Sequence, residues 1–311
     1  MTQRLLAALA ALLLLAGCAT QTRSLLAAPR SGPHQQELSA TPFHAQERYQ
    51  CGPAALAMLL GAAAVDTSPE ALVPEVYLPG REGSLQLELL AAARHHGALA
   101  APISPRLDAL LAEIDAGHPV LVLQNLSLPI VPKWHYAVVI GYDLDRGEVI
   151  LRSGTTRRMT MPLSTFEHTW SRSGYWGMVA LAPGHIPATT ELKTLLPALI
   201  AYEKAAPPQS VQLTYRAALQ RWPDTLALQL GVGNSAYAGG DRTAAADAFR
   251  RAAASHPDSG AAFNNLAVVL GELGQLAEAR AAAQTAIGLG GPWRDEAQAT
   301  LRTLQGAAVS H

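Results

Sequence analysis

The chain has 311 residues, of which 49% are apolar and 15% are charged, and its formal net charge is −1. This length favours two compact domains over one, and the apolar content is that of chains that fold around hydrophobic cores. A nearly neutral chain without a run of basic residues lacks the electrostatic footprint of a nucleic-acid-binding protein, so we expect no nucleic-acid partner.

The first residues have the pattern of a segment that directs export. Arg4 is followed by an unbroken run of eleven Leu and Ala residues, 5–15, and then by two small residues and Cys18. A helix needs about 20 apolar residues to span a membrane, whereas this run has the length of a signal-peptide core. We therefore expect residues 1–17 to be a signal peptide.

The end of this segment, Leu15-Ala16-Gly17-Cys18, resembles the bacterial lipobox. The resemblance implies that Cys18 is acylated and becomes the mature N-terminus, so that acyl chains such as palmitate hold the protein on a membrane. Because Ala19 is not Asp, the resemblance to Gram-negative lipoproteins favours the outer membrane, facing the periplasm. The alternative is an ordinary secretory signal followed by an incidental cysteine.

Residues 18–42 join the lipidated cysteine to small and polar residues and several prolines, which predicts a flexible tether. Residues 43–186 have a mixed pattern, with helices first and strands later, which predicts an α+β domain. The expected helices begin at Pro53, near Ser68 and near Ser84, and the expected strands are 119–123, 136–142 and 148–151.

A period of 34 residues runs through 190–306. Aromatic, Pro, Gly and Ala residues recur at matching positions of successive units: Tyr215 and Phe249; Pro223 and Pro257; Gly240 and Gly274; Ala218, Ala252 and Ala286. Glycine allows the turn between paired helices, and alanine lets the helices approach closely. The pattern resembles tetratricopeptide repeats and predicts an all-α solenoid, with a generic helical bundle as the alternative.

Cys51 precedes a predicted helix whose first turn contains Pro53. The free N–H groups and the macrodipole of a helix N-terminus favour an anion, so we expect this position to favour the thiolate. If Cys18 carries the lipid, Cys51 has no disulfide partner, because the chain has only these two cysteines. The N–H groups and an upstream amide, from Gln46 or Gln50, are expected to form an oxyanion hole. The alternative is a small buried cysteine without chemistry.

His135 stands at the head of the apolar run 136–142, where a rigid strand can aim an imidazole at the thiol. We predict that it accepts the thiol proton and later protonates the leaving amine; the alternative is a satisfied strand histidine. Four other histidines are expected at helix ends or on the surface: His95, His96, His118 and His168. None of them has a carboxylate at metal-ligand spacing, so the sequence predicts no metal and no cofactor.

The motifs Gln46-x-x-x-x-Cys51-Gly-Pro-Ala-Ala-Leu and His135-Tyr-Ala-Val-Val-Ile-Gly-Tyr-Asp resemble those of C39-like papain-fold cysteine peptidases, the family of bacteriocin-leader processing domains. The resemblance runs from about residue 43 to 182. It implies a papain-like α+β fold and a peptide or protein substrate. It also implies that Cys51 is the nucleophile, His135 the general base and acid, and Gln46 the oxyanion donor.

Two positions depart from the family pattern. Gln46 lies one residue nearer to the cysteine than the family's oxyanion glutamine commonly does. The family supplies an Asp or Asn after the histidine, whereas this chain has Ser153 in the corresponding stretch, with Asp143 as an alternative. A neutral hydroxyl stabilises an imidazolium less than a carboxylate does, so weak activity is one of the expected outcomes.

The sequence supports two functions of different classes. The first is a membrane-anchored periplasmic cysteine peptidase that cleaves a peptide or protein through a Cys-His acyl-enzyme, with the repeats recruiting the substrate or a partner protein. The second is a lipoprotein adaptor with a weak or inactive peptidase fold, whose repeats mediate protein–protein interaction. The presence of Cys51 and His135 favours the first function, and Ser153 favours the second.

Overall fold

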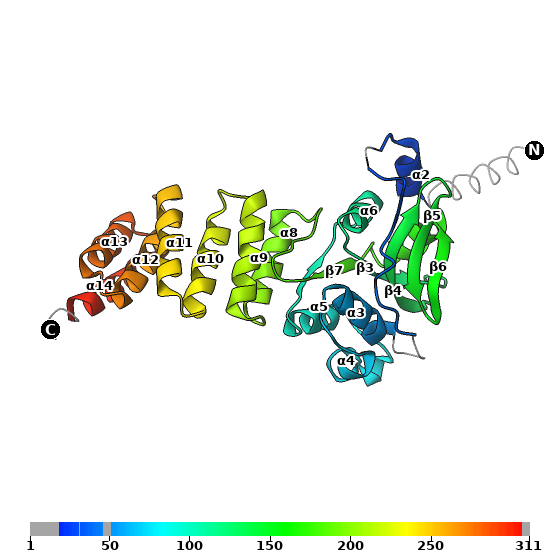
Figure 1. The fold of residues 1–311 in the computed structure, drawn as a ribbon, viewed down its shortest axis with the longest axis horizontal. Helices are drawn as coiled ribbons and strands as arrows, with labels where there is room; N and C mark the ends of the chain where they lie inside the picture. The colour runs from blue at the N-terminus through cyan, green and yellow to red at the C-terminus, as the bar shows by residue number, and fades with distance from the viewer. Residues whose placement is uncertain (1–18, 31, 46–50, 307–311) are drawn as a thin grey trace, which may run out of the picture. The chain divides into compact units, whose positions relative to one another are not determined.

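The structure is a computed structural model that describes residues 19–30, 32–45 and 51–306 (Figure 1). Internal contacts divide the chain into two compact units. The first consists of the residues up to Ala182 together with Pro187–Ala198, and the second of Pro183–Ile186 together with the residues from Leu199 onward. The first unit has helices and a sheet and the second only helices, so the predicted order of fold classes is confirmed.

The first unit is built on a seven-stranded sheet in which every strand pair is antiparallel. The strand order is β2-β7-β3-β4-β5-β6, and β1 also pairs with β4. The strands are β1 (Gln35–Glu37), β2 (Leu99–Pro102), β3 (Val120–Asn125), β4 (Trp134–Asp143), β5 (Glu148–Ser153), β6 (Thr156–Pro162) and β7 (Gly177–Leu181). The sequence predicted β3, β4 and β5, whose apolar runs are buried on both faces. It missed β6, because most side chains of that edge strand are exposed and polar.

Helices cover both faces of this sheet. They are α3 (Cys51–Ala62), α4 (Pro69–Val76), α5 (Gln86–His95), α6 (Leu107–Asp115) and α7 (Leu163–Ser171), with a short 3₁₀ turn at Pro79–Arg81. Figure 1 shows α3, α4 and α5 together on one side of the strands and α6 on the other. Helix α4 begins near Ser68, as predicted, and Ser68 caps it, because the Ser68 hydroxyl accepts from the N–H of Ala71.

The alternation of side chains along β4 divides the interior into two cores. Tyr136, Val138 and Ile140 pack in the core that contains α3. Ala137 and Val139 pack in the core that contains α6 and α7. The side chains of β4 thus lie alternately on the two faces of the sheet, and the start of α3 meets the strand on the face of Tyr136, Val138 and Ile140.

The prediction of a flexible tether over residues 18–42 is wrong for the described part of that segment. Thr20–Ala27 form a helix, α2, which contacts α6 and α7, and Gln35–Glu37 pair with β4 as β1. The free N–H groups of Gln21 and Thr22 in the first turn of α2 donate to the buried carboxylate of Glu167, at 3.0 and 2.7 Å. A partner 145 residues away leaves no periodic signal in a short polar segment, so composition alone suggested a linker.

The helices of the second unit follow one another in antiparallel pairs. They are α9 (Pro208–Arg221), α10 (Leu226–Ala238), α11 (Arg242–Ser255), α12 (Gly260–Glu272), α13 (Leu276–Leu289) and α14 (Arg294–Gly306), and α8 (Leu192–Glu203) spans the division between the units. Gly240 and Gly274 adopt φ values of +83° and +74° between paired helices, as the 34-residue spacing predicted. Ala218, Ala252 and Ala286 are fully buried, which confirms them as close-contact positions. No helix in the described ranges is long and apolar enough to cross a membrane.

A buried carboxylate ties the segment that follows β7 to the sheet domain. Glu113 of α6 is fully buried and accepts from the N–H groups of Ala188 and Thr189, both at 3.0 Å. It also accepts from the Thr189 hydroxyl at 3.0 Å and contacts the ring of His118 at 2.9 Å. Burial acts to raise the pKa of Glu113, but its hydrogen bonds to His118, Ala188 and Thr189 outweigh burial and lower it.

The lowered pKa means that ionised Glu113 stabilises the fold above about pH 5 and that this contribution is lost as the pH falls through the folded-state pKa. We expect Glu113→Gln to lower the free energy of unfolding by about 1–3 kcal/mol at pH 7, measured by urea unfolding. The difference from the parent should shrink as the parent's carboxylate becomes protonated at acid pH.

Glu191→Gln is the matched control, because Glu191 is exposed and pairs only with Lys193 in an exposed ion pair. This variant should unfold like the parent. If the two variants were equally stable at pH 7, the buried carboxylate would not hold residues 188 and 189.

Candidate active site

Cys51 is the first residue of α3, so the helix begins two residues earlier than Pro53, where the sequence placed its start. The side chain is partly buried, and the cysteine is a free thiol. Gly52 follows, and a Cβ at that position would lie 2.2 Å from the hydroxyl oxygen of Ser84. The absence of a side chain at Gly52 therefore lets residue 84 close over the first turn of α3 beside the sulfur.

The backbone N–H groups of Tyr136 and Gly52 lie beside the sulfur and, with that of Cys51 itself, act to lower the pKa of the thiol. Burial nevertheless raises the pKa of the thiol above its ordinary value, because the N–H groups only partly offset the loss of water. The expectation that the helix start would favour the thiolate is therefore wrong for the resting protein. The N–H groups lie where expected, but burial outweighs them.

The sulfur lies at an open edge of β4. The first register pair of β4 with β5 is Val138 with Arg152, so the beginning of β4 extends past β5. The N–H groups of successive strand residues point to opposite neighbours. The β3 partner of Tyr136 is Leu123, whose N–H donates to the carbonyl of Trp176 and not to β4. The N–H of Tyr136 therefore points away from β3, to the side where β5 is absent, and there it lies beside the sulfur of Cys51.

His135 is the second residue of β4, directly before Tyr136. Its Nε2 lies 2.9 Å from the hydroxyl oxygen of Ser153, the last residue of β5. The pKa of the imidazole is lowered, first by burial and then by the positive charge of Lys133, so the ring is neutral at pH 7. The hydrogen bond to Ser153 occupies Nε2 and leaves Nδ1 as the nitrogen available to the thiol.

The thiol and the imidazole approach the same end of β4 from different sides. Because side chains alternate along a strand, that of His135 lies on the same face of the sheet as those of Ala137 and Val139. Helix α3 packs on the opposite face, together with Tyr136. The sulfur lies beside the N–H of Tyr136, and Cys51 packs against the core that contains α3. The ring of His135 contacts Ser153, and among the described residues no hydrogen bond joins it to the sulfur of Cys51.

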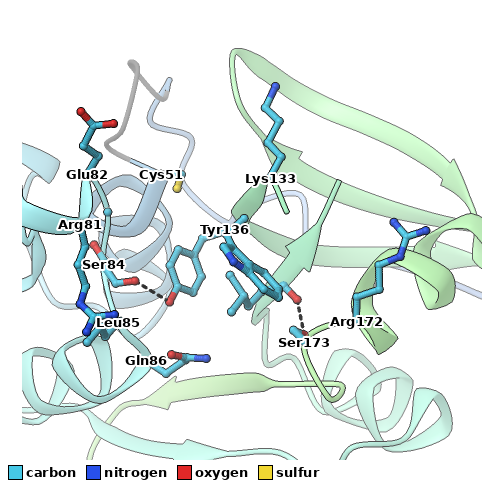
Figure 2. A pocket seen from close by; sticks show the side chains of 13 residues that line it. Cys51, Arg81, Glu82, Ser84, Leu85, Gln86, Lys133, Tyr136, Arg172 and Ser173 are labelled. Carbon is cyan, nitrogen blue, oxygen red and sulfur yellow. Dashed lines mark hydrogen bonds between the residues drawn. The ribbon is translucent and has the colours of Figure 1, made fainter. Parts of the chain in front are cut away.

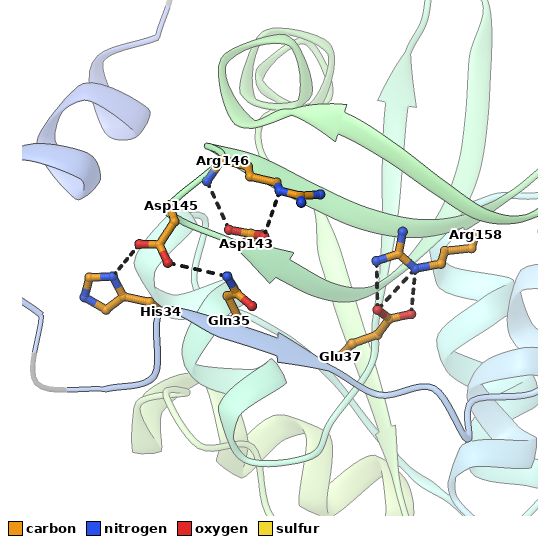
Figure 3. Close-up of polar contacts among 7 residues, drawn as sticks. All are labelled: His34, Gln35, Glu37, Asp143, Asp145, Arg146 and Arg158. Atoms are coloured by element: carbon orange, nitrogen blue, oxygen red, sulfur yellow. Dashed lines mark hydrogen bonds and ion pairs between the residues drawn. The ribbon is translucent and has the colours of Figure 1, made fainter.

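The other residues predicted to take part in catalysis lie either outside the described residues or away from the thiol. Gln46, with Gln50 as its alternative, lies outside the described residues, as does Cys18. Asp143 is at the opposite end of β4 from His135 and pairs with Arg146 (Figure 3), so it does not orient the imidazole. No described group of three or more His, Cys, Asp or Glu side chains is arranged to hold a metal ion.

Of the remaining histidines, His95 and His96 lie near Glu75 at the end of α5, in keeping with a place at a helix end. His118 also lies at a helix end: its N–H donates to the carbonyl of Glu113 at 2.9 Å just after α6, and its ring is largely buried against the Glu113 carboxylate. Its sequence neighbours are typical of an exposed turn, and the partner that buries it comes from the preceding helix.

A pocket of about 750 Å³ opens beside the thiol (Figure 2). Figure 2 shows Cys51 between Glu82 on one wall and Lys133 on the other, with the ring of Tyr136 below. The phenol of Tyr136 donates to the carbonyl of Ser84 at 3.1 Å, which ties the two walls together. The sequence did not indicate Tyr136, because its contribution is a backbone N–H and a buried ring, and neither has a motif.

Two family models match the chain. Residues 35–178 match the Peptidase_C39 like family, and residues 230–292 match the tetratricopeptide repeat. The chain carries a C39-like peptidase domain and tetratricopeptide repeats. The domain match includes Cys51, His135 and Ser153 and begins within β1, ahead of the boundary at 43 that the sequence suggested.

Two solved structures are similar to the C39-like domain. One, from Bacillus anthracis and described as a C39-like peptidase, is 20% identical and covers 47% of this chain and 97% of its own, with a TM-score of 0.40. The other is a double glycine motif protease from an AMS/PCAT transporter in complex with the leader peptide; it is 20% identical and covers 45% of this chain and 89% of its own, with a TM-score of 0.34. No curated protein matches the chain.

Ser153→Asp should raise the pKa of His135, because a carboxylate beside Nε2 favours the imidazolium and opposes burial and Lys133. The measurement is an NMR pH titration of the ring Cε1–Hε1 signals, with His135 assigned by its loss in His135→Ala. Ser153→Asn, which is neutral and of similar size, should leave the pKa below its ordinary value. Indistinguishable titrations of the Asp and Asn variants would mean that residue 153 does not contact the ring in solution.

Proposed function

We propose that the C39-like domain is a cysteine peptidase, with Cys51 as nucleophile and His135 as general base and acid. The observation that supports this most strongly is that the sulfur binds the backbone N–H of Tyr136, the residue adjacent to His135, while His135 is held through Nε2 by Ser153. A strand residue thus brings a free thiol and a neutral imidazole to one end of the sheet. Acyl-transfer chemistry on a thiol requires these two groups to come within hydrogen-bond reach of each other when the substrate binds.

The reaction begins from a neutral pair, because burial raises the pKa of Cys51 and lowers that of His135. When a peptide carbonyl reaches the sulfur, the thiol proton passes to Nδ1 of His135 and the sulfur attacks the carbonyl carbon. The carbonyl oxygen becomes an oxyanion, which the N–H groups at the start of α3 and the amide of Gln46 stabilise. The imidazolium then protonates the departing amine, and water hydrolyses the thioester.

Ser153 supports a second candidate, a peptidase-fold adaptor of low or no activity. A hydroxyl holds the ring of His135 in place but does not compensate the charge that the ring gains during proton transfer. The repeats would then be the working part, binding a protein partner on a solenoid surface. The two candidates differ in whether bound peptides are cleaved.

We expect the parent to cleave members of a defined peptide library at neutral pH, and Cys51→Ala to cleave none while its thermal midpoint stays nearly unchanged. His135→Ala should lose at least about 100-fold in rate, because it lacks the group that moves the proton. Cleavage is measured by mass spectrometry of the products. His95→Ala is the matched control: His95 is exposed on α5, and this variant should keep the parent's rate.

Turnover that persists in Cys51→Ala would refute the nucleophile assignment. A parent that binds library peptides without cleaving any of them would establish the adaptor instead.

We also propose that the chain is a lipoprotein anchored through Cys18 on the periplasmic face of the bacterial outer membrane, with the repeats recruiting the substrate or a partner protein. The lipobox-like sequence 15–18 supports the anchor. The structure adds a consequence: α2 begins two residues after Cys18 and binds Glu167, so a lipid at Cys18 would hold the domain close to the membrane rather than on a long tether.

The mature protein should therefore begin at an acylated Cys18 and enter the detergent phase of a Triton X-114 separation. Cys18→Ser should remain in the aqueous phase, because no thiol is left for the acyl chain. Cys51→Ser, the matched control, should partition as the parent does. A mature N-terminus at any other residue, found by mass spectrometry, would contradict the anchor.

A further inference from the structure

The loop that connects β3 to β4 exposes an unusual amount of apolar surface. Of the eleven large hydrophobic side chains that are exposed among the described residues, five belong to residues 126–134. Their exposed fractions are 42% for Leu126, 60% for Leu128, 86% for Ile130, 66% for Val131 and 50% for Trp134. Apolar surface gathered in this way marks a binding surface more often than a structural accident.

Hydrogen bonds hold the base of this loop firmly. The side-chain oxygen of Asn125, which is buried, accepts from the N–H groups of Ser127 and Lys133 at 3.0 and 2.9 Å. Arg172 donates to the carbonyls of Asn125 and Ser127 at 3.1 and 2.6 Å. Leu126 closes the loop by donating to the carbonyl of Lys133 at 2.9 Å. The apolar tip is therefore presented on a fixed base.

The loop is continuous with the pocket beside the thiol. Lys133 and Trp134 belong to both, and the apolar residues Leu85 and Leu123 extend the same surface toward Cys51. A concave, partly apolar site that continues into a projecting apolar loop fits an extended chain better than it fits the flat surface of a bilayer.

The charges of the side chains that line the pocket indicate which kind of peptide would bind there. Three cationic side chains and one anionic side chain line the pocket: Arg81, Lys133, Arg172 and Glu82. Within the described ranges, none of the three cations has a carboxylate partner, and the contacts of Arg172 are to neutral carbonyls. The excess of positive charge favours a peptide that carries carboxylates among its apolar residues.

We propose that residues 126–134 and the pocket beside Cys51 form the binding surface for an apolar, acidic segment of a peptide substrate. This inference rests on the proposed function, because it assigns a substrate class to the same site. Ile130 and Val131 bind apolar side chains of the peptide at the loop tip, and Lys133 binds a carboxylate at the pocket rim.

The test measures binding separately from cleavage. The full chain with Cys51→Ala, which cannot turn the peptide over, is titrated against a fluorescein-labelled decapeptide of alternating Leu and Asp, and the dissociation constant is read from fluorescence anisotropy. Ile130→Ser combined with Val131→Ser should raise the dissociation constant about tenfold. Lys133→Glu should weaken the binding of the Leu–Asp peptide and strengthen the binding of a decapeptide of alternating Leu and Lys.

Leu289→Ser, an exposed apolar position on α13, is the matched control and should bind like the parent. Equal affinity for Leu–Asp and Ser–Asp peptides, or an unchanged dissociation constant in the Ile130/Val131 variant, would overturn the inference. If that variant lost flotation with phosphatidylglycerol vesicles while its peptide affinity stayed the same, the loop would be a membrane contact instead. If the parent chain bound the peptide but never cleaved it, the proposed peptidase activity would be refuted, whereas the proposed binding surface would stand.

Discussion

The open edge at the beginning of β4 is the constraint on which the site depends. Because β5 pairs with β4 only from Val138 onward, the sulfur of Cys51 can lie beside the N–H of Tyr136 on that side of β4. Because β5 stops pairing there, its last residue, Ser153, lies within hydrogen-bond reach of His135. One feature of strand pairing therefore gathers the thiol, the imidazole and the hydroxyl at one end of the sheet.

Burial sets the chemical state of this group. It raises the pKa of Cys51 and lowers that of His135, so both are neutral at rest. A neutral thiol is protected from oxidation, since the thiolate is the reactive form. It also makes charge separation part of the reaction, and the hydroxyl of Ser153 compensates less of that charge than a carboxylate would. For the peptidase that we propose, these two properties predict low intrinsic activity, which binding of an extended segment by residues 126–134 would offset.

Sequence reasoning succeeded where one residue type has one structural meaning. The sequence predicted a helix start near Ser68, turns at Gly240 and Gly274, and the strands β3 and β4 from their apolar runs. It failed where contacts with residues distant in the sequence determine the local structure or the pKa of a side chain. The segment 20–27 is helical because Glu167 receives its N–H groups, and the pKa of Cys51 is set by how deeply α3 is covered. Motifs identified Cys51 and His135, whereas the N–H of Tyr136 and the apolar loop required coordinates.

The central claim is that the sulfur of Cys51 and the imidazole of His135 act as a pair at the open edge of β4. A crystal structure of the chain with Cys51 trapped as a thioether by a peptidyl chloromethyl ketone tests it most directly. The account predicts that Nδ1 of His135 lies within hydrogen-bond reach of the sulfur or of the trapped carbonyl oxygen while Nε2 remains on Ser153. An imidazole that stayed out of hydrogen-bond reach of both the sulfur and the trapped carbonyl oxygen, with the peptide bound away from Lys133 and Trp134, would contradict it.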